Sequence, residues 1–168
     1  MSTESDVRYL LDRIEIQDKV ALYGLGQDLH QAGSSNKNVL EQWSQLFTED
    51  ATIDLSSLGL KVFHLPEYAE LMRGKGMRGG GLEDQYDAWQ HLEGHATVKI
   101  DGDTATSLAL HWHSHQTRDG KANLIDAGYW HDQWVRTAAG WRIKARRHQS
   151  LYTNTFPRVE NPPFLPAE

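Results

Sequence analysis

Apolar residues recur at helical spacing early in the chain and alternate with polar residues later. In the first thirty residues the apolar positions lie three or four apart, and Asp6 can cap this pattern, which predicts a helix up to about His30. A second amphipathic stretch, Val39 to Phe47, predicts another helix after a Gly/Ser/Asn-rich loop at 31–38. Two helices are therefore expected before the main strands.

The middle of the chain is less regular. Short strands are expected at 51–55 and 60–64, and Pro66 stands where it can open a short helix. Glycines crowd the segment that follows, and polar residues come after them. This composition predicts a mobile loop or partial lid over 74–90.

Long alternating segments fill the rest of the chain. The strands predicted there are 91–100, 104–117, 122–136 and 141–150. They are separated by short turns such as Asp-Gly, which predicts an antiparallel meander. Helices followed by such a sheet are typical of an α+β domain: a cone-shaped, curved antiparallel sheet with N-terminal helices on its concave face. We expect this domain over 1–150 and an extended proline-rich arm over 151–168.

Composition excludes several function classes. The net charge is −6 and no Lys/Arg run is longer than Arg146-Arg147, so a nucleic-acid partner is not expected. The absence of cysteine excludes disulfides, thiolate metal sites and a cysteine nucleophile. The sequence has no signal-like N-terminus and no run of 18 apolar residues, which predicts a cytoplasmic protein without a membrane span.

Three histidines occupy alternate positions of one predicted strand. His111, His113 and His115 share a face, and at about 3.3 Å per residue the outer two lie about 13 Å apart, so one metal ion can take only two neighbours. Further ligands would have to come from elsewhere, for example His91, Asp126 or His131. No ligand pattern marks them, and no metal or other cofactor is predicted. Alternation alone does not decide whether this face or the opposite row, Leu108, Leu110 and Trp112, faces the core.

The order of several motifs resembles a known family. They are Tyr23 followed by Asp28, then "LFTEDATID" (46–54), "QHLEGHATVKIDGDTA" (90–105) and "GYWHDQWVRTAAGWRIKARR" (128–147). Over residues 7–150 they resemble the SnoaL-like branch of the nuclear transport factor 2-like superfamily, whose fold is a cystatin-like cone. That superfamily includes polyketide cyclases, scytalone dehydratase, bile acid dehydratase and hexachlorocyclohexane dehydrochlorinase, as well as binding and scaffold proteins.

The resemblance implies a catalytic dyad of Asp28 and His91. A carboxylate that holds one ring nitrogen of a histidine fixes the tautomer and raises the basicity of the other nitrogen, so the imidazole can take a proton from carbon. The alternative is an ordinary helix-end aspartate and an ordinary strand histidine. His115 matches a pocket histidine of scytalone dehydratase, and His113 and His111 would line the same wall.

Further candidates for substrate binding are Tyr23, the helical aromatic of the resemblance, and Asp126 and Trp130. The last two share a strand face and would form another pocket wall, or else pack in the core. The resemblance also shows departures. Arg146 stands where the family places an arginine that binds an anionic or carbonyl group, but strict alternation puts it on a solvated basic stripe unless a bulge intervenes. Gln27, Leu55 and Trp130 replace two tyrosines and an asparagine of scytalone dehydratase, which argues against that reaction.

The resulting prediction is a cofactor-independent lyase or isomerase for a hydrophobic, oxygenated small molecule. His91 would be the general base, Asp28 would orient it, and His113 or His115 would polarise a substrate oxygen, giving dehydration, cyclisation or isomerisation. The alternatives are a non-catalytic ligand-binding or oligomerisation module, and a metal-binding enzyme that uses the histidine-rich strand. We expect a homodimer or homotrimer formed through the outer face of the sheet.

Overall fold

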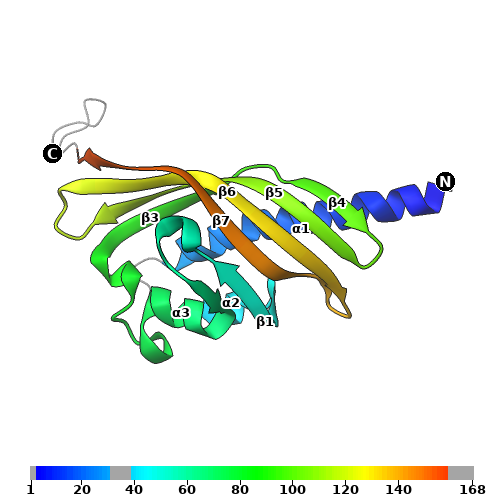
Figure 1. The fold of residues 1–168 in the computed structure, drawn as a ribbon, viewed down its shortest axis with the longest axis horizontal. Coiled ribbons are helices and arrows are strands. Elements are labelled where there is room, and N and C mark those ends of the chain that lie inside the picture. Colours follow the sequence, from blue (N-terminus) through cyan, green and yellow to red (C-terminus); the bar gives the residue numbers. More distant parts are fainter. Residues whose placement is uncertain (1–2, 31–38, 159–168) are drawn as a thin grey trace.

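A computed structural model describes residues 3–30 and 39–158 and shows a long helix beside a strongly curved sheet (Figure 1). The predicted loop 31–38 and the end of the chain from 159 lie outside the described residues. The helices are α1 (Thr3–Leu29), α2 (Val39–Trp43) and α3 (Leu65–Arg73). The strands are β1 (Phe47–Asp54), β2 (Val62–His64), β3 (Tyr86–Glu93), β4 (Thr97–Asp101), β5 (Thr104–Thr117), β6 (Ala122–Thr137) and β7 (Gly140–Pro157).

The sheet has seven strands in the order β2-β1-β7-β6-β5-β3, and β4 also pairs with β5. The β5-β6-β7 meander is antiparallel, as the alternating segments predict. However, β1 runs parallel to β7, so the curved sheet is mixed and not antiparallel throughout. The strands β1 and β7 are not joined by a hairpin, so no turn sequence fixes their relative direction.

One face of helix α1 packs against the concave side of the sheet (Figure 1). Ile16, Val20 and Tyr23 are buried in the core, together with the tryptophans of α2 and of β6 and β7. The apolar residues nearer the N-terminus, which show the same helical spacing, are largely exposed: Val7, Leu10, Leu11 and Ile14. The helix extends beyond the sheet at this end (Figure 1), so helical periodicity alone did not reveal how much of α1 is covered. None of the helices in the described residues combines the length and the apolar composition that a membrane span requires.

Several element boundaries differ from prediction. Helix α2 ends at Trp43 and does not continue to Phe47 as predicted. Phe47 is the first residue of β1. The strand expected at 91–100 is interrupted at 94–96, and its two parts, β3 and β4, both pair with β5. Strand β7 continues to Pro157, into the segment expected to form an arm, while the division into 1–150 and 151–168 stays a prediction.

The segment predicted as a loop over 74–90 is irregular only as far as Gln85 and contains two short 3₁₀ turns, Lys75–Met77 and Leu82–Gln85. It is fastened to α3 by a buried ion pair, in which Arg73 Nε lies 2.5 Å from Glu83 Oε2. Arg73 also donates a 2.6 Å hydrogen bond to the carbonyl of His30. From Tyr86 the chain already forms β3, so the predicted loop was too long at its C-terminal end.

A bulge in β7 changes which residues face inward. Gln133 pairs with Ala145 and Trp134 pairs with Ile143, so Lys144 is an extra residue in β7. Beyond this point the alternation shifts by one, and Arg146 turns into the interior, where it is 1% exposed. The interpretation of Arg146 as part of a solvated stripe was therefore wrong, and the bulge that an inward Arg146 requires is present.

Candidate active site

A pocket of about 170 Å³ lies on the concave side of the sheet. Side chains from α1, α3 and four strands surround it, and the segment before β3 adds Leu82. The predicted site residues that line it are Tyr23, His91, His111, His113, His115 and Trp130. It is also lined by Gln27, Leu55, Leu58, Leu60, Tyr68, Met72, Tyr86 and His148. Six of the residues predicted for the site therefore line one pocket in the structure.

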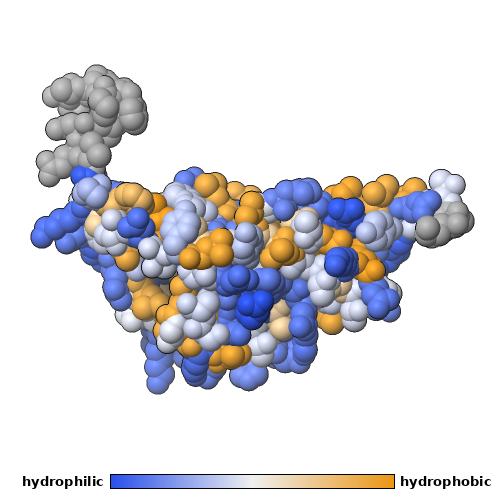
Figure 2. All heavy atoms as spheres, turned by 45° about the horizontal axis from the view of Figure 1, so that its top comes forward, coloured by the Kyte–Doolittle hydropathy of each residue, from blue (hydrophilic) through white to orange (hydrophobic). Residues whose placement is uncertain are grey.

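The alternation of β5 places its histidines inward. His111 is 3% exposed, whereas Leu108 and Leu110 on the other face are 38% and 59% exposed. Figure 2 shows apolar side chains exposed among hydrophilic ones on the surface of the molecule. The three histidines thus form one wall of the pocket, and the apolar row faces outward.

Asp28 and His91 are in direct contact, although they are 63 positions apart in the sequence. Asp28 stands near the C-terminus of α1, and its two oxygens accept hydrogen bonds from the backbone N–H of His91 at 3.0 and 3.1 Å. The same carboxylate lies 2.9 Å from Nδ1 of the His91 ring. Nε2 of His91 has no hydrogen-bond partner among the described residues, and the His91 side chain borders the pocket. With Nδ1–H donating to Asp28, the lone pair of Nε2 is available to a bound molecule.

Close packing of α1 on β3 permits this contact. A Cβ at Gly24 would lie 3.0 Å from Cγ of Glu93 and 3.3 Å from Cβ of His91. Glycine at this position lets the last turns of α1 approach β3 closely, so that Asp28 reaches His91. Glycine at this position lowers the intrinsic stability of the helix, but it allows α1 to pack closely against β3.

The three histidines of β5 have lowered pKa values. Burial lowers the pKa of His111 and lowers that of His113 well below its usual range, and neighbouring imidazoles contribute to the effect on His113. Burial and the neighbouring His91 lower the pKa of His115 to about 3. These rings are therefore neutral near pH 7, and each offers one hydrogen-bond donor and one acceptor.

His148 is a site residue that the sequence pattern did not reveal. It is 1% exposed, its Nδ1 lies 3.0 Å from Oγ of Ser57, and its Nε2 lies 2.9 Å from Oδ2 of Asp126. Burial tends to raise the pKa of Asp126, but His148 and the hydroxyl of Ser150 outweigh it and lower that pKa. Asp126 itself does not line the pocket and supports His148 from behind. Only the bulge at Lys144 reveals that His148 faces inward.

A pair of tyrosines closes another side of the pocket. The hydroxyls of Tyr23 and Tyr68 are 2.9 Å apart, and Gln27 Nε2 lies 3.4 Å from the Tyr23 oxygen. Burial raises the pKa of Tyr23 and raises that of Tyr68 well above its usual value. Other residues occupy the positions of the two scytalone dehydratase tyrosines, but this chain has a different tyrosine pair. Tyr68 was not identified because nothing in the sequence of α3 distinguishes it from a core aromatic.

Arg146 does not line the pocket. Its Nε and Nη2 donate to the two oxygens of Asp132 at 2.7 and 2.8 Å, and both side chains are fully buried. Its guanidinium carbon lies 4.2 Å from the ring centre of Tyr23 and 4.8 Å from that of Trp130. The structure therefore gives Arg146 a supporting place behind two wall residues rather than a substrate contact.

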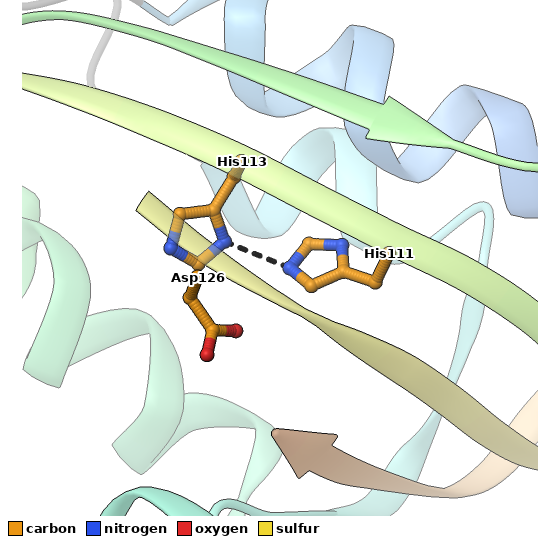
Figure 3. A group of neighbouring side chains, drawn as sticks. All are labelled: His111, His113 and Asp126. Carbon is orange, nitrogen blue, oxygen red and sulfur yellow. Dashed lines mark hydrogen bonds between the residues drawn. The ribbon is translucent and has the colours of Figure 1, made fainter. Parts of the chain in front are cut away.

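One group of side chains has the composition of a metal site. His111, His113 and Asp126 each offer a ligand atom, and these atoms lie within 4.8 Å of one another (Figure 3). His111 Nε2 and His113 Nδ1 are joined by a 2.8 Å hydrogen bond.

Comparisons with known proteins agree with this fold. The chain is 26% identical over 140 residues to an uncharacterized protein of Mycobacterium tuberculosis (strain ATCC 25618 / H37Rv), covering 83% of this chain and 89% of that protein. It is 28% identical over 124 residues to the anthranilate 1,2-dioxygenase small subunit of Burkholderia cepacia, covering 68% and 76%. The solved structure of a hexachlorocyclohexane dehydrochlorinase from Novosphingobium barchaimii LL02 is similar with a TM-score of 0.69 at 16% identity, covering 96% of this chain and 99% of that one. Residues 8–147 match the SnoaL-like domain, and the chain belongs to this family.

Proposed function

We propose that this protein is a lyase or isomerase that removes a proton from a carbon atom beside an activating group. His91 is the general base, and Asp28 holds its ring in the reactive tautomer. The observation that carries the proposal is the 2.9 Å contact between Asp28 Oδ1 and His91 Nδ1, with Nε2 of His91 left without a partner among the described residues beside the pocket. The membership of the SnoaL-like family supports it, because proteins of this fold include a dehydrochlorinase.

The lining of the pocket indicates the class of substrate. Leucines and Met72 supply apolar walls, and the β5 histidines supply neutral hydrogen-bond donors and acceptors. A cavity of about 170 Å³ fits a small molecule or the reacting part of a larger one. A hydrophobic, oxygenated compound matches this lining, with His113 or His115 donating a hydrogen bond to the oxygen that gains negative charge as the proton leaves. The reaction is then dehydration, cyclisation, isomerisation or a related elimination.

Proton exchange with solvent tests the base even though the natural substrate is unidentified. A panel of cyclic ketones and β-hydroxy ketones is incubated with the enzyme in D₂O, and loss of the α-proton signals or elimination is followed by NMR. We expect at least one compound to react, and His91→Gln to lower its rate by roughly 10²–10⁴-fold. His131→Ala is the matched control, because His131 bonds Gln149 and does not line the pocket. A His91→Gln protein as fast as the control would refute the proposal.

A second candidate is a non-catalytic subunit. The similarity to a dioxygenase small subunit favours it, as does the row of exposed leucines on the outer face of the sheet, including Leu92 and Leu110. On either hypothesis we propose that this face joins copies of the chain into a homodimer or homotrimer. Analytical ultracentrifugation of wild type and Leu110→Lys tests the interface: a wild-type oligomer that the substitution leaves intact argues against it. Absence of proton exchange across the whole panel favours the non-catalytic role.

A further inference from the structure

Two neighbouring histidines and one carboxylate converge between β5 and β6 (Figure 3). His111 and His113 are two residues apart on β5 and so share a face, and Asp126 is directly opposite His113 in the antiparallel register. The residue opposite His111 is Gly128, which adds no side chain to the group. The spacing of residues along a strand allows one ion to contact only two neighbouring histidines of the three, and His111 and His113 are such a pair.

The three side chains are held by further polar contacts. Glu93 Oε1 lies 3.0 Å from Nδ1 of His111, and both side chains are 2% exposed. This contact directs the other nitrogen of His111 toward His113. Ser150 donates a 2.5 Å hydrogen bond to Oδ1 of Asp126. Carboxylates on the far nitrogen of a histidine, and hydrogen bonds to a coordinating carboxylate, are the usual supports of metal ligands.

Two buried carboxylates at this place lack a full set of partners. Glu93 Oε2 has no hydrogen-bond partner among the described residues. Asp126 Oδ2 is 2.9 Å from His148 Nε2 but forms no hydrogen bond of suitable geometry with any described residue. The buried arginine nearby, Arg146, is already paired with Asp132. A cation between the two histidines and Asp126 would offset the negative charge that burial makes costly.

We propose that His111, His113 and Asp126 bind one divalent first-row transition-metal ion of the zinc class. Imidazole nitrogens and a carboxylate oxygen are suitable ligands for such ions, and three protein ligands leave positions open to the pocket. The two nitrogens are 2.8 Å apart, whereas two ligands at about 2.0–2.1 Å from a tetrahedral zinc ion are separated by about 3.3 Å, so the rings need to spread only slightly. The ion replaces the hydrogen bond between the rings.

The position of the site relates it to the proposed chemistry. The rings of His91 and His113 have centroids 5.3 Å apart, so a substrate oxygen at an open position of the ion would lie near the proposed base. An ion there would polarise that oxygen and acidify the adjacent carbon–hydrogen bond. This consequence rests on the proposed function, whereas binding of the ion does not.

Metal binding is tested on tag-free protein that has been treated with a chelator and then exchanged into chelator-free buffer. Isothermal titration with Zn²⁺ gives the affinity and the number of ions, and Co²⁺ reports ligand geometry through its visible absorption. We expect one ion per chain, with binding lost in His113→Ala and in Asp126→Asn. Glu93→Gln, which alters only a supporting contact, should weaken binding by roughly 10–100-fold.

The control is His131→Ala, which removes a histidine from β6 that lies outside the pocket, and it should bind the ion as wild type does. His113→Gln gives the same comparison as His113→Ala if the smaller side chain prevents folding. Wild-type protein that binds neither ion, or a His113 variant with wild-type affinity, overturns the proposal. Because no substrate is present, this outcome leaves the proton-exchange test of His91 unaffected.

Discussion

Replacing Asp132 by asparagine should destabilise the protein strongly, because it leaves a buried cation without its counter-charge. Arg146 Nε and Nη2 bond Asp132 at 2.7 and 2.8 Å, both side chains are 0% exposed, and Nη1 has no hydrogen-bond partner among the described residues. After the substitution, the guanidinium keeps mainly the aromatic faces of Tyr23 and Trp130. Each charge-assisted hydrogen bond contributes about 1.5–3 kcal/mol, and breaking a buried ion pair costs about 3–5 kcal/mol. Asparagine is nearly isosteric with aspartate, so no cavity adds to this figure.

Urea unfolding followed by tryptophan fluorescence measures the loss, since the chain has six tryptophans. A loss of about 3–5 kcal/mol corresponds to a fall in Tm of about 6–20 °C for a chain of this size. The control is Asp103→Asn: Asp103 also pairs with an arginine, Arg136, but its side chain is 83% exposed, and removal should cost no more than about 1 kcal/mol. Equal, small losses in the two variants would show that the buried pair of Asp132 and Arg146 contributes little to stability. The double substitution Asp132→Leu with Arg146→Met should recover much of the loss, because no unpaired charge remains.

Two further predictions concern other parts of the fold. The hydrogen bonds from Arg136 hold the pKa of Asp12 at about 2, below its ordinary 3.8, so its stabilisation is present above about pH 4 and is lost as the pH falls toward 2. Urea unfolding at several pH values should show an acid-dependent loss of about 1–2 kcal/mol that Asp12→Asn lacks, and identical pH profiles would contradict this. Gly24→Val should lower the free energy of unfolding by about 1–3 kcal/mol, because its side chain would collide with β3 near His91. Leu25→Ala, on the exposed side of α1, should cost much less, and a Gly24→Val protein as stable as this control would refute the close approach.

Local sequence signals predicted the elements whose partners are near in sequence. Strand β5 begins and ends at the predicted residues, 104 and 117, because alternation is regular there and Asp-Gly turns bound it. The C-terminal end of α1, at Leu29, followed equally from its periodicity, but α1 begins at Thr3, so Asp6 lies in its first turn and the prediction of Asp6 as the cap was wrong. Pairings between distant segments were not encoded in any local pattern. The direction of β1 beside β7 is the main example, and the interruption of the strand predicted at 91–100 is another.

In the site, too, the features that depend on contacts between distant segments could not be predicted from local sequence signals. The bulge at Lys144 depends on how β7 fits against β6, and without it neither the inward turn of Arg146 nor the place of His148 can be derived. The contact between Asp28 and His91 joins positions 63 residues apart, and it was anticipated only through the family resemblance. The inward face of the β5 histidines depends on where α1 packs, because Leu108 and Leu110 made the opposite choice equally consistent with alternation.

The role of His91 as the base is measured by the rate of proton exchange in His91→Ala relative to wild type on the same compound. We expect a rate lower by roughly 10²–10⁴-fold, with partial recovery when free imidazole is added to occupy the vacated space beside Asp28. A His91→Ala protein that exchanges the proton as fast as wild type would contradict the assignment of His91 as the base.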